Sequence, residues 1–180
     1  MTDTALLLVD VQRSFEVRPY WSEKDLPAFR DRLLALIEGC KARKVPIVRI
    51  LHVEDEGAFS LASGLVKPMA WLPEHHDVLF HKHVHNAFTD TGLDYWLRTR
   101  GIKKVIVTGI RTEQCCETTT RVASDLGYAV DYVTEATLTF PMTHPNGRTY
   151  SPEELKERTE LVLEGRFASI KTVTQCLAGL

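Results

Sequence analysis

Long hydrophobic runs are absent from this sequence of 180 residues, and neither sign of charge is in excess. No apolar run approaches the roughly 18 residues that cross a membrane, so we expect no membrane partner. The 22 Lys and Arg residues nearly balance the 24 Asp and Glu residues, which gives no reason to expect nucleic acid as a partner. The first residues, MTDTALLLVDVQRSF, place an acid rather than basic residues before a short apolar run, so we expect no secretory signal peptide.

Cysteine is scarce, and its spacing excludes a disulfide-rich scaffold. The four cysteines form no CxxC pair: Cys40, Cys115, Cys116 and Cys176. A reducing cytoplasm is therefore the expected location. With 44% hydrophobic and 26% charged residues, the chain has an ordinary globular composition. We expect residues 1–180 to form one domain that folds without disulfides or a structural metal.

Short apolar runs, partly β-branched, alternate with helical patterns. The runs of this kind are Ala5–Val9, Pro46–Leu51, Lys104–Thr108 and Ala129–Val133, with weaker ones at Val78–Phe80 and around Ser169–Val173. Such runs predict strands that are buried on both faces of a parallel sheet. Strands separated by helices predict a single doubly wound (Rossmann-like) α/β fold, with a mainly parallel sheet and helices on both faces.

The helical segments carry recognisable starts and stops. A stripe of apolar residues from Leu26 to Cys40 follows Ser22-Glu-Lys-Asp25, which resembles a capping box with Asp in place of Glu. Leu93, Trp96 and Leu97 repeat this spacing before Gly101, which predicts a second helix. A third is expected over 113–126, ending at Gly127, and a fourth after the N-cap Ser151. The stretch 53–76 is long for a connection, which favours a functional or interface loop.

Three chemically capable residues follow predicted strands, at the edge where open α/β sheets carry their active sites. Asp10 follows the first strand, and Lys82 follows the weak strand at 78–80. Cys115 follows the strand at 104–108, after Gly109, which we expect to form a sharp turn. Alone, the Asp would be a turn cap, the Lys a surface charge and the Cys a small core residue. Together they predict an assembled site.

The adjacent cysteines are expected to differ. Cys115 falls in the first helical turn, where free backbone N–H groups and the helix dipole stabilise a thiolate, so we expect a lowered pKa. Adjacent helix residues point about 100° apart, so at most one sulfur reaches the sheet edge. Cys116 is then expected to pack inward. Burial of both as small hydrophobes remains an alternative.

Histidines are also grouped near Lys82. His81, His83 and His85 alternate and would share one face of an extended segment. No Asp or Glu lies among them to complete a ligand set, so a polar loop or pocket lining is the favoured interpretation over a metal site.

Longer motifs span the same positions. ALLLVDVQRSF reads as an apolar strand followed by D-x-Q-x-x-F. KHVHNAFTDTGLDYWL fits K-x-x-x-[SN]-A-F-x-x-T-x-L, and VTGIRTEQCCETT fits G-x-x-T-[DE]-x-C-V-x-x-T with Cys116 in place of Val. In their order and separation these motifs resemble the isochorismatase-like cysteine hydrolase superfamily, which includes nicotinamidases, N-carbamoylsarcosine amidase-like enzymes and ureide hydrolases. The resemblance covers nearly the whole chain.

The resemblance implies roles for individual residues. Cys115 would be the nucleophile, Asp10 the proton acceptor and Lys82 the third member of a triad. A cis peptide would join Ile110 to Arg111, and the backbone N–H groups of Arg111 and Cys115 would form the oxyanion hole. The implied reaction is hydrolysis of a C–N bond in a small non-peptide amide or ureide through a thioester.

The sequence departs from nicotinamidases in the loop after the second strand. Nicotinamidases carry an Asp-x-His metal-binding set there, whereas this chain reads LHVEDEGAFSLASG. His52 with Glu54 or Asp55 is a weak substitute, and His75 and His76 are the next histidines along the chain. We therefore expect no metal and no cofactor, and the loop does not favour nicotinamidase activity.

Substrate-binding candidates are drawn from the expected loops near the site: Phe15, Trp21, His83, His85 and Arg111. The Arg111 side chain could pair with a substrate carboxylate or with Glu113. By analogy with relatives, a homodimer or homotetramer is expected, with the apolar segment 69–71 as a candidate interface.

Two other functions remain open. In an isochorismatase-type vinyl-ether hydrolase, protonation by Asp10 would be the chemistry and Cys115 would be dispensable. In a non-enzymatic redox sensor, only Cys115 would matter. The presence of all three residues favours the amide hydrolase.

Overall fold

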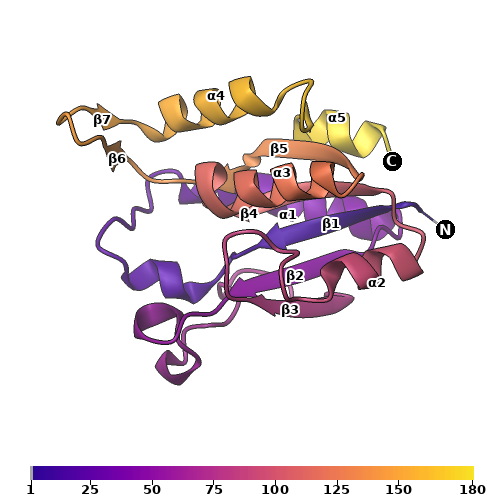
Figure 1. Cartoon of the computed structure of the whole chain (residues 1–180), viewed down its shortest axis with the longest axis horizontal. Helices are drawn as coiled ribbons and strands as arrows, with labels where there is room; N and C mark the ends of the chain where they lie inside the picture. The colour runs from indigo at the N-terminus through magenta and orange to yellow at the C-terminus, as the bar shows by residue number, and fades with distance from the viewer. Residues whose placement is uncertain (1) are drawn as a thin grey trace.

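A computed structural model describes residues 2–180 and contains a six-stranded, fully parallel sheet in the order β3-β2-β1-β4-β5-β8 (Figure 1). The strands are β1 (Thr4–Val9), β2 (Ile47–His52), β3 (Val78–Lys82), β4 (Lys104–Ile110), β5 (Ala129–Leu138) and β8 (Ser169–Ile170). All six predicted strands are confirmed, and the predicted doubly wound α/β fold with them. The last strand is shorter than expected because a helix begins at Val173.

Helices cover both faces of this sheet. One face carries α1 (Leu26–Ala42) and α5 (Val173–Ala178), and the other carries α2 (Leu93–Thr99), α3 (Glu117–Asp125) and α4 (Pro152–Leu163). In Figure 1, α1 lies behind the sheet and α3 in front of it. A small antiparallel pair, β6 (Met142–Thr143) and β7 (Thr149–Tyr150), precedes α4.

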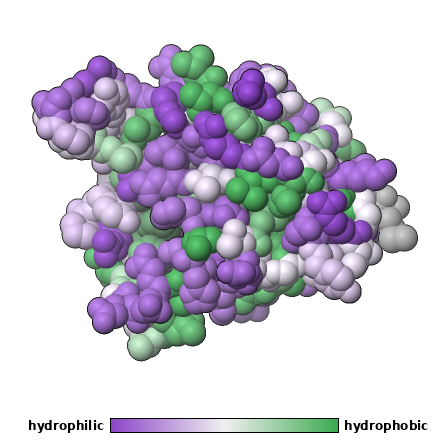
Figure 2. Space-filling view, in the orientation of Figure 1, coloured by the Kyte–Doolittle hydropathy of each residue, from purple (hydrophilic) through white to green (hydrophobic). Residues whose placement is uncertain are grey.

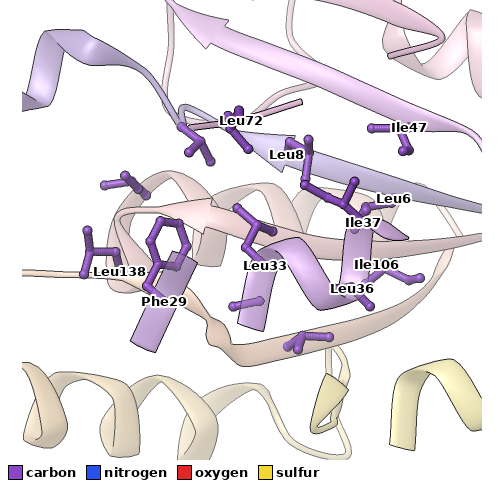
Figure 3. Packing of buried hydrophobic residues seen from close by; sticks show 14 of the residues in the cluster. Leu6, Leu8, Phe29, Leu33, Leu36, Ile37, Ile47, Leu72, Ile106 and Leu138 are labelled. Atoms are coloured by element: carbon purple, nitrogen blue, oxygen red, sulfur yellow. The ribbon is translucent and has the colours of Figure 1, made fainter. Parts of the chain in front are cut away.

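Alternation along β1 supplies both cores. Leu6 and Leu8 pack toward α1, while Leu7 and Val9 pack toward the opposite helices, because successive side chains of a strand point to opposite faces. The predicted apolar stripe of α1 meets this first core, with Phe29, Leu33, Leu36 and Ile37 set against the sheet (Figure 3). A strand buried on both faces must be apolar at every position, as β1 is after its first residue.

The predicted N-cap of α4 at Ser151 is confirmed. The Ser151 hydroxyl accepts from the Glu154 backbone N–H at 3.2 Å, and the Glu154 carboxylate accepts from the Ser151 N–H at 2.8 Å. This reciprocal capping box satisfies two backbone donors that the first turn of a helix would otherwise leave unpaired.

The predicted capping box at Ser22 is wrong. The helix α1 has Asp25 as its N-cap and begins at Leu26, whereas a cap at Ser22 would start it one turn earlier. That earlier start would place Pro27 in the second turn, where proline lacks the N–H that the helix needs. With Asp25 as the N-cap, Pro27 occupies the second helical position, where no intrahelical N–H bond is lost.

Gly109 has a different role from the predicted turn. It lies inside β4, beside Val9 of β1, with a φ of +127°. A Cβ at this position would lie 1.9 Å from the Val9 carbonyl oxygen. Glycine is therefore required for the close approach of two strands, and the chain turns only after Ile110.

The segment 53–76 lies at the carboxyl edge of the sheet, where the arrowheads of β1 and β2 point in Figure 1. Residues 69–71 were expected to form an interface with a second subunit. In the structure Met69 is buried, and the Trp71 ring packs edge-on against the Phe29 ring with centroids 5.8 Å apart. These side chains therefore complete the core under α1 and leave little apolar surface for a partner.

The surface in the view of Figure 2 is mostly hydrophilic, with hydrophobic patches, one of them over α4. Leu161 of that helix is 79% exposed. Within residues 2–180, no helix combines the length and the apolar character needed to cross a membrane.

Candidate active site

Three charged or nucleophilic side chains meet at the carboxyl edge of the sheet: Asp10, Lys82 and Cys115. Lys82 Nζ lies 2.8 Å from Asp10 Oδ2 and 3.4 Å from Cys115 Sγ. Asp10 and Lys82 are fully buried, and Cys115 is 8% exposed. The sequence-based expectation that these residues lie together therefore agrees with the geometry.

The topology explains this meeting. The strand order reverses direction between β1 and β4, and such switch points open a crevice at the carboxyl edge. Asp10 directly follows β1, in a left-handed conformation with a φ of 55°. Cys115 lies in a π-helical turn, Thr112–Cys116, that follows β4. Lys82 is the last residue of β3 rather than a loop residue.

The pKa of Lys82 is set by opposing effects. Burial lowers it, but the Asp10 carboxylate and the Cys115 sulfur together outweigh burial, and the pKa lies above its ordinary value. Lys82 is therefore a charged ammonium at neutral pH, paired with Asp10. A buried ion pair of this kind places a fixed positive charge beside the thiol.

The predicted lowering of the Cys115 pKa is wrong. Burial raises the pKa of this thiol, the nearby Asp10 carboxylate raises it further, and the Lys82 ammonium opposes them only in part. The helix-dipole argument considered only the backbone, whereas desolvation of the sulfur and a neighbouring anion dominate here. The resting side chain is a neutral thiol.

Cys116 packs inward, as its helical offset from Cys115 predicted. It is fully buried in the core shared with Ala123 and Tyr132. Burial raises the pKa of its thiol well above the ordinary value. The cavity at the sheet edge is lined by Cys115 and not by Cys116.

The Ile110–Arg111 peptide is cis, as the resemblance implied. The Arg111 side chain is committed elsewhere: its Nε lies 3.2 Å from Glu113 Oε1, and its guanidinium lies 5.0 Å from the Tyr20 ring centroid. Of the two pairings considered for Arg111, the structure contains the one with Glu113. Arg111 does not line the cavity beside Asp10 and Cys115, which argues against its side chain as a substrate ligand.

A cavity of about 120 Å³ adjoins Asp10 and Cys115. Its other lining residues are Phe15, Arg18, Tyr20, His52, Glu54, Phe59, His85 and Gln114. Among the substrate-binding candidates, Phe15 and His85 line this cavity, whereas Trp21, His83 and Arg111 do not. Trp21 instead packs against Phe140, with ring centroids 5.5 Å apart. His83 is exposed.

Several lining residues were missed because their signal is not local. Arg18 and Gln114 are ordinary polar residues in the sequence, and Phe59 belongs to a loop without periodicity. His52 was considered only as a metal ligand. In the structure His52 lies opposite Lys82 in the parallel pair of β2 and β3, a register that the sequence alone does not give.

The donor set does not fit a metal ion. Over residues 2–180, no group of three or more His, Cys, Asp or Glu side chains is arranged to hold one. His52 Nδ1 lies 3.0 Å from the Lys82 ammonium, so that nitrogen already faces a cation. His75 and His81 are exposed.

Comparisons with known proteins identify the family of this chain. The isochorismatase domain model matches residues 4–165. The isochorismatase family protein YrdC of Bacillus subtilis (strain 168) is 27% identical over 182 residues, covering 96% of this chain and 94% of that protein. Nicotinamidase 3 of Arabidopsis thaliana is 29% identical over 180 residues, covering 91% and 82%.

Solved structures extend the likeness to three dimensions. A hydrolase of the isochorismatase family from Chromobacterium violaceum ATCC 12472 superposes with a TM-score of 0.89 at 26% sequence identity, covering 98% of this chain and 93% of that one. The family model spans most of the chain, and the six-stranded sheet is shared with these neighbours. The chain therefore belongs to the isochorismatase family, and the protein is a hydrolase.

Proposed function

We propose that this protein hydrolyses a C–N bond of a small non-peptide amide or ureide through a thioester on Cys115. The observation that carries the proposal is the position of Lys82 Nζ, 2.8 Å from the Asp10 carboxylate and 3.4 Å from the Cys115 sulfur. An acid–base group, a fixed cation and a nucleophile within reach of one another are the minimal parts of a covalent hydrolase.

The first step starts from a neutral thiol, because the pKa of Cys115 is raised by burial and by Asp10. As the sulfur attacks the substrate carbonyl carbon, its proton passes to the Asp10 carboxylate. The S–C bond forms, the C=O electron pair moves onto oxygen, and Lys82 keeps its charge throughout. General-base transfer of this kind contributes about 10² to 10⁴ in rate.

The developing oxyanion accepts hydrogen bonds from the backbone N–H groups of Arg111 and Cys115 in this proposal. Collapse of the tetrahedral intermediate breaks the C–N bond, and the proton on Asp10 passes to the leaving nitrogen. Asp10 then accepts a proton from water, which cleaves the thioester. The C–S bond breaks, the proton on Asp10 passes to the Cys115 sulfur, and the acid product leaves, so that one water is consumed per turnover.

The substrate is expected to be small. A cavity of about 120 Å³ with Phe15, Tyr20 and Phe59 in its lining suits a compact planar amide or ureide. One relative, Nicotinamidase 3, is named for an amide substrate. Arg18 lines the cavity and is available for an acidic group on the substrate, since the Arg111 side chain is paired with Glu113.

An ammonia-release panel tests the reaction. We would assay nicotinamide, N-carbamoylsarcosine and ureidoacrylate with the wild type and with Cys115→Ala. Release by the wild type alone supports the proposal. A parallel assay follows pyruvate release from isochorismate. Equal turnover of the panel by both proteins, or isochorismate cleavage that does not need Cys115, would reject the thioester route in favour of proton-driven hydrolysis.

We further propose that residues 1–180 are one domain acting in the cytoplasm as a homodimer or homotetramer. Support for one domain comes from the single six-stranded sheet, whose strands run from β1 near the start of the sequence to β8 near its end. Light scattering coupled to size-exclusion chromatography measures the oligomeric state, and a monomer at micromolar concentration would reject the oligomer.

A further inference from the structure

His52 is a buried imidazole in contact with the triad. It is the last residue of β2 and 9% exposed. Its Nδ1 lies 3.0 Å from Lys82 Nζ, and its Nε2 lies 3.4 Å from Glu54 Oε1. The imidazole therefore lies between the Glu54 carboxylate and the Lys82 ammonium.

The fold fixes this imidazole from both sides. Gln12, fully buried, accepts from the His52 backbone N–H at 2.7 Å and donates to the His52 carbonyl at 3.0 Å. The ring packs edge-on against Phe59 at 5.7 Å between centroids and stacks on His85 at 6.5 Å. The Gln12 hydrogen bonds fix the His52 backbone, and the Phe59 and His85 rings pack against its imidazole. The imidazole therefore cannot turn away from Lys82 unless these neighbours also move.

The hydrogen-bonding capacity of Lys82 shows what His52 contributes. An ammonium has three N–H donors and no acceptor. Around Lys82 Nζ lie four acceptor atoms: Asp10 Oδ2 at 2.8 Å, His52 Nδ1 at 3.0 Å, the Val84 carbonyl oxygen at 3.1 Å and Cys115 Sγ at 3.4 Å. The three donors serve hydrogen bonds to His52 Nδ1, the Val84 carbonyl oxygen and Cys115 Sγ, while Asp10 forms an ion pair with the ammonium. His52 is therefore the neutral side chain that orients the ammonium toward the thiol and the carboxylate.

Only one form of His52 fits this arrangement. Nδ1 must be unprotonated to accept from the ammonium, so the ring is neutral and carries its proton on Nε2, facing Glu54. The charged and titratable groups around the ring are Lys82 from β3, Asp10 after β1, Glu54 in its own segment and His85 in the loop after β3. Burial and Lys82 lower the pKa of His52, against the opposing effect of Asp10 and Glu54.

We propose that His52 is a positioning residue whose neutral imidazole holds the Lys82 ammonium between Asp10 and Cys115. The proposal rests on the proposed function of the triad. Protonation of His52 replaces the acceptor by a donor and sets a second positive charge beside Lys82, so activity is present while His52 is neutral and is lost as pH falls through its pKa.

Two substitutions separate the acceptor from the charge. His52→Asn keeps an acceptor near the position of Nδ1 but cannot be protonated, and His52→Leu keeps bulk without an acceptor. We expect His52→Leu to lower kcat about tenfold or more with little change in KM, the size of a lost hydrogen bond to a charged group. We expect His52→Asn to retain most of kcat and to lose the acid limb that the wild type has below about pH 6.5.

The matched control is His81→Asn. His81 is exposed and precedes Lys82 in the sequence, so this substitution should leave kcat and the acid limb of its pH profile unchanged. The rates are measured on whichever amide of the panel the wild type hydrolyses fastest. An unchanged acid limb in His52→Asn, or a kcat for His52→Leu equal to that of the wild type, overturns the proposal.

A second measurement needs no substrate. In protein labelled with ¹⁵N-histidine, long-range ¹H–¹⁵N spectra identify the tautomer of His52, assigned by the signal that disappears in His52→Asn. We expect an unprotonated Nδ1, a protonated Nε2 and a titration midpoint below about 6.5. A proton on Nδ1 at pH 7 overturns the proposal.

The two proposals fail differently. If Cys115→Ala hydrolyses the panel amides as well as the wild type does, the thioester mechanism is wrong whatever the His52 variants do. If Cys115→Ala is inactive while His52→Leu is fully active, the thioester mechanism stands and the positioning role of His52 is wrong.

Discussion

Two buried carboxylates in this protein have opposite surroundings. Glu117 of α3 accepts from Arg121 Nε at 3.1 Å and from the Thr159 hydroxyl at 3.3 Å, and it also pairs with Arg158. Asp10 has the Lys82 ammonium at 2.8 Å from Oδ2 and the Cys115 thiol beside it, and no backbone N–H, hydroxyl or guanidinium donor among residues 2–180 reaches its oxygens. Both side chains are almost completely removed from solvent.

The difference separates a structural carboxylate from a reactive one. The oxygens of Glu117 are occupied by donors that tie α3 to α4, so a proton arriving there would break several contacts. Asp10 retains free acceptor capacity and lies at a cavity beside a thiol. A buried carboxylate is therefore not by itself a sign of function. A buried carboxylate that has unused acceptor capacity and lies beside a nucleophile does indicate a reactive site.

The largest expected effect is the loss of the nucleophile from the reactive region. Cys115→Ala should abolish hydrolysis in the ammonia-release assay while the circular dichroism spectrum stays that of the wild type, because the thioester cannot form. The control is Cys116→Ala, which should remain active and lose about 1 kcal/mol of stability, because its sulfur fills core volume. Activity lost with Cys116 and kept without Cys115 would reverse the assignment.

The next effect tests the free acceptor on Asp10. Asp10→Asn is nearly isosteric but cannot take the thiol proton, so kcat should fall by about 10² to 10⁴. KM should change little, since the cavity keeps its shape. Stopped-flow and steady-state rates measure both constants, and an Asp10→Asn enzyme with wild-type kcat contradicts the acid–base role of this residue.

Alkylation tests the neutral thiol without a substrate. Because the pKa of Cys115 is raised, iodoacetamide should modify it at pH 7.4 about tenfold or more slowly than free cysteine, since the thiolate is the reacting form. The rate should rise as pH increases toward the thiol pKa. Mass spectrometry should find the label on Cys115, which lines the cavity, before Cys116. Rapid labelling at pH 7.4 would mean a preformed thiolate.

A smaller effect is expected at the structural carboxylate. Glu117→Gln replaces the carboxylate that pairs with two partly exposed arginines by a neutral amide. We expect a loss of about 1 to 2 kcal/mol in the free energy of unfolding. The folded variant should keep wild-type kcat. Urea denaturation and the ammonia assay measure the two quantities, and a large fall in kcat with unchanged stability would contradict the comparison with Asp10.

The smallest expected effect is that of chelation. The backbone N–H groups supply the proposed oxyanion contacts, so no step in the proposed cycle requires a metal. Dialysis against EDTA should leave kcat unchanged, with zinc, manganese and iron readdition as controls. Activity that is lost on dialysis and restored by one of these ions would require a metal-assisted mechanism.

Local pattern predicted the strands and most helices because each depends on neighbours in sequence. The strands β1 and β2 are buried on both faces, and such burial favours apolar residues at nearly every position. The predicted cap at Ser22 is wrong because it would place Pro27 in the second turn of α1, where proline is disfavoured. The predicted turn at Gly109 is wrong because the close approach of Val9 depends on the neighbouring strand, which the sequence of β4 does not reveal.

The sequence by itself determined the parallel α/β fold and the three residues that meet at its carboxyl edge, because strand order and strand ends follow from a repeated local pattern. Only the tertiary structure decided the surroundings of those residues. It buried Cys115 deeply enough for desolvation to outweigh the helix dipole, and it paired Arg111 with Glu113. It also brought His52 to Lys82 across adjacent strands. Solvation and contacts between distant segments depend on packing in three dimensions, which no local pattern encodes.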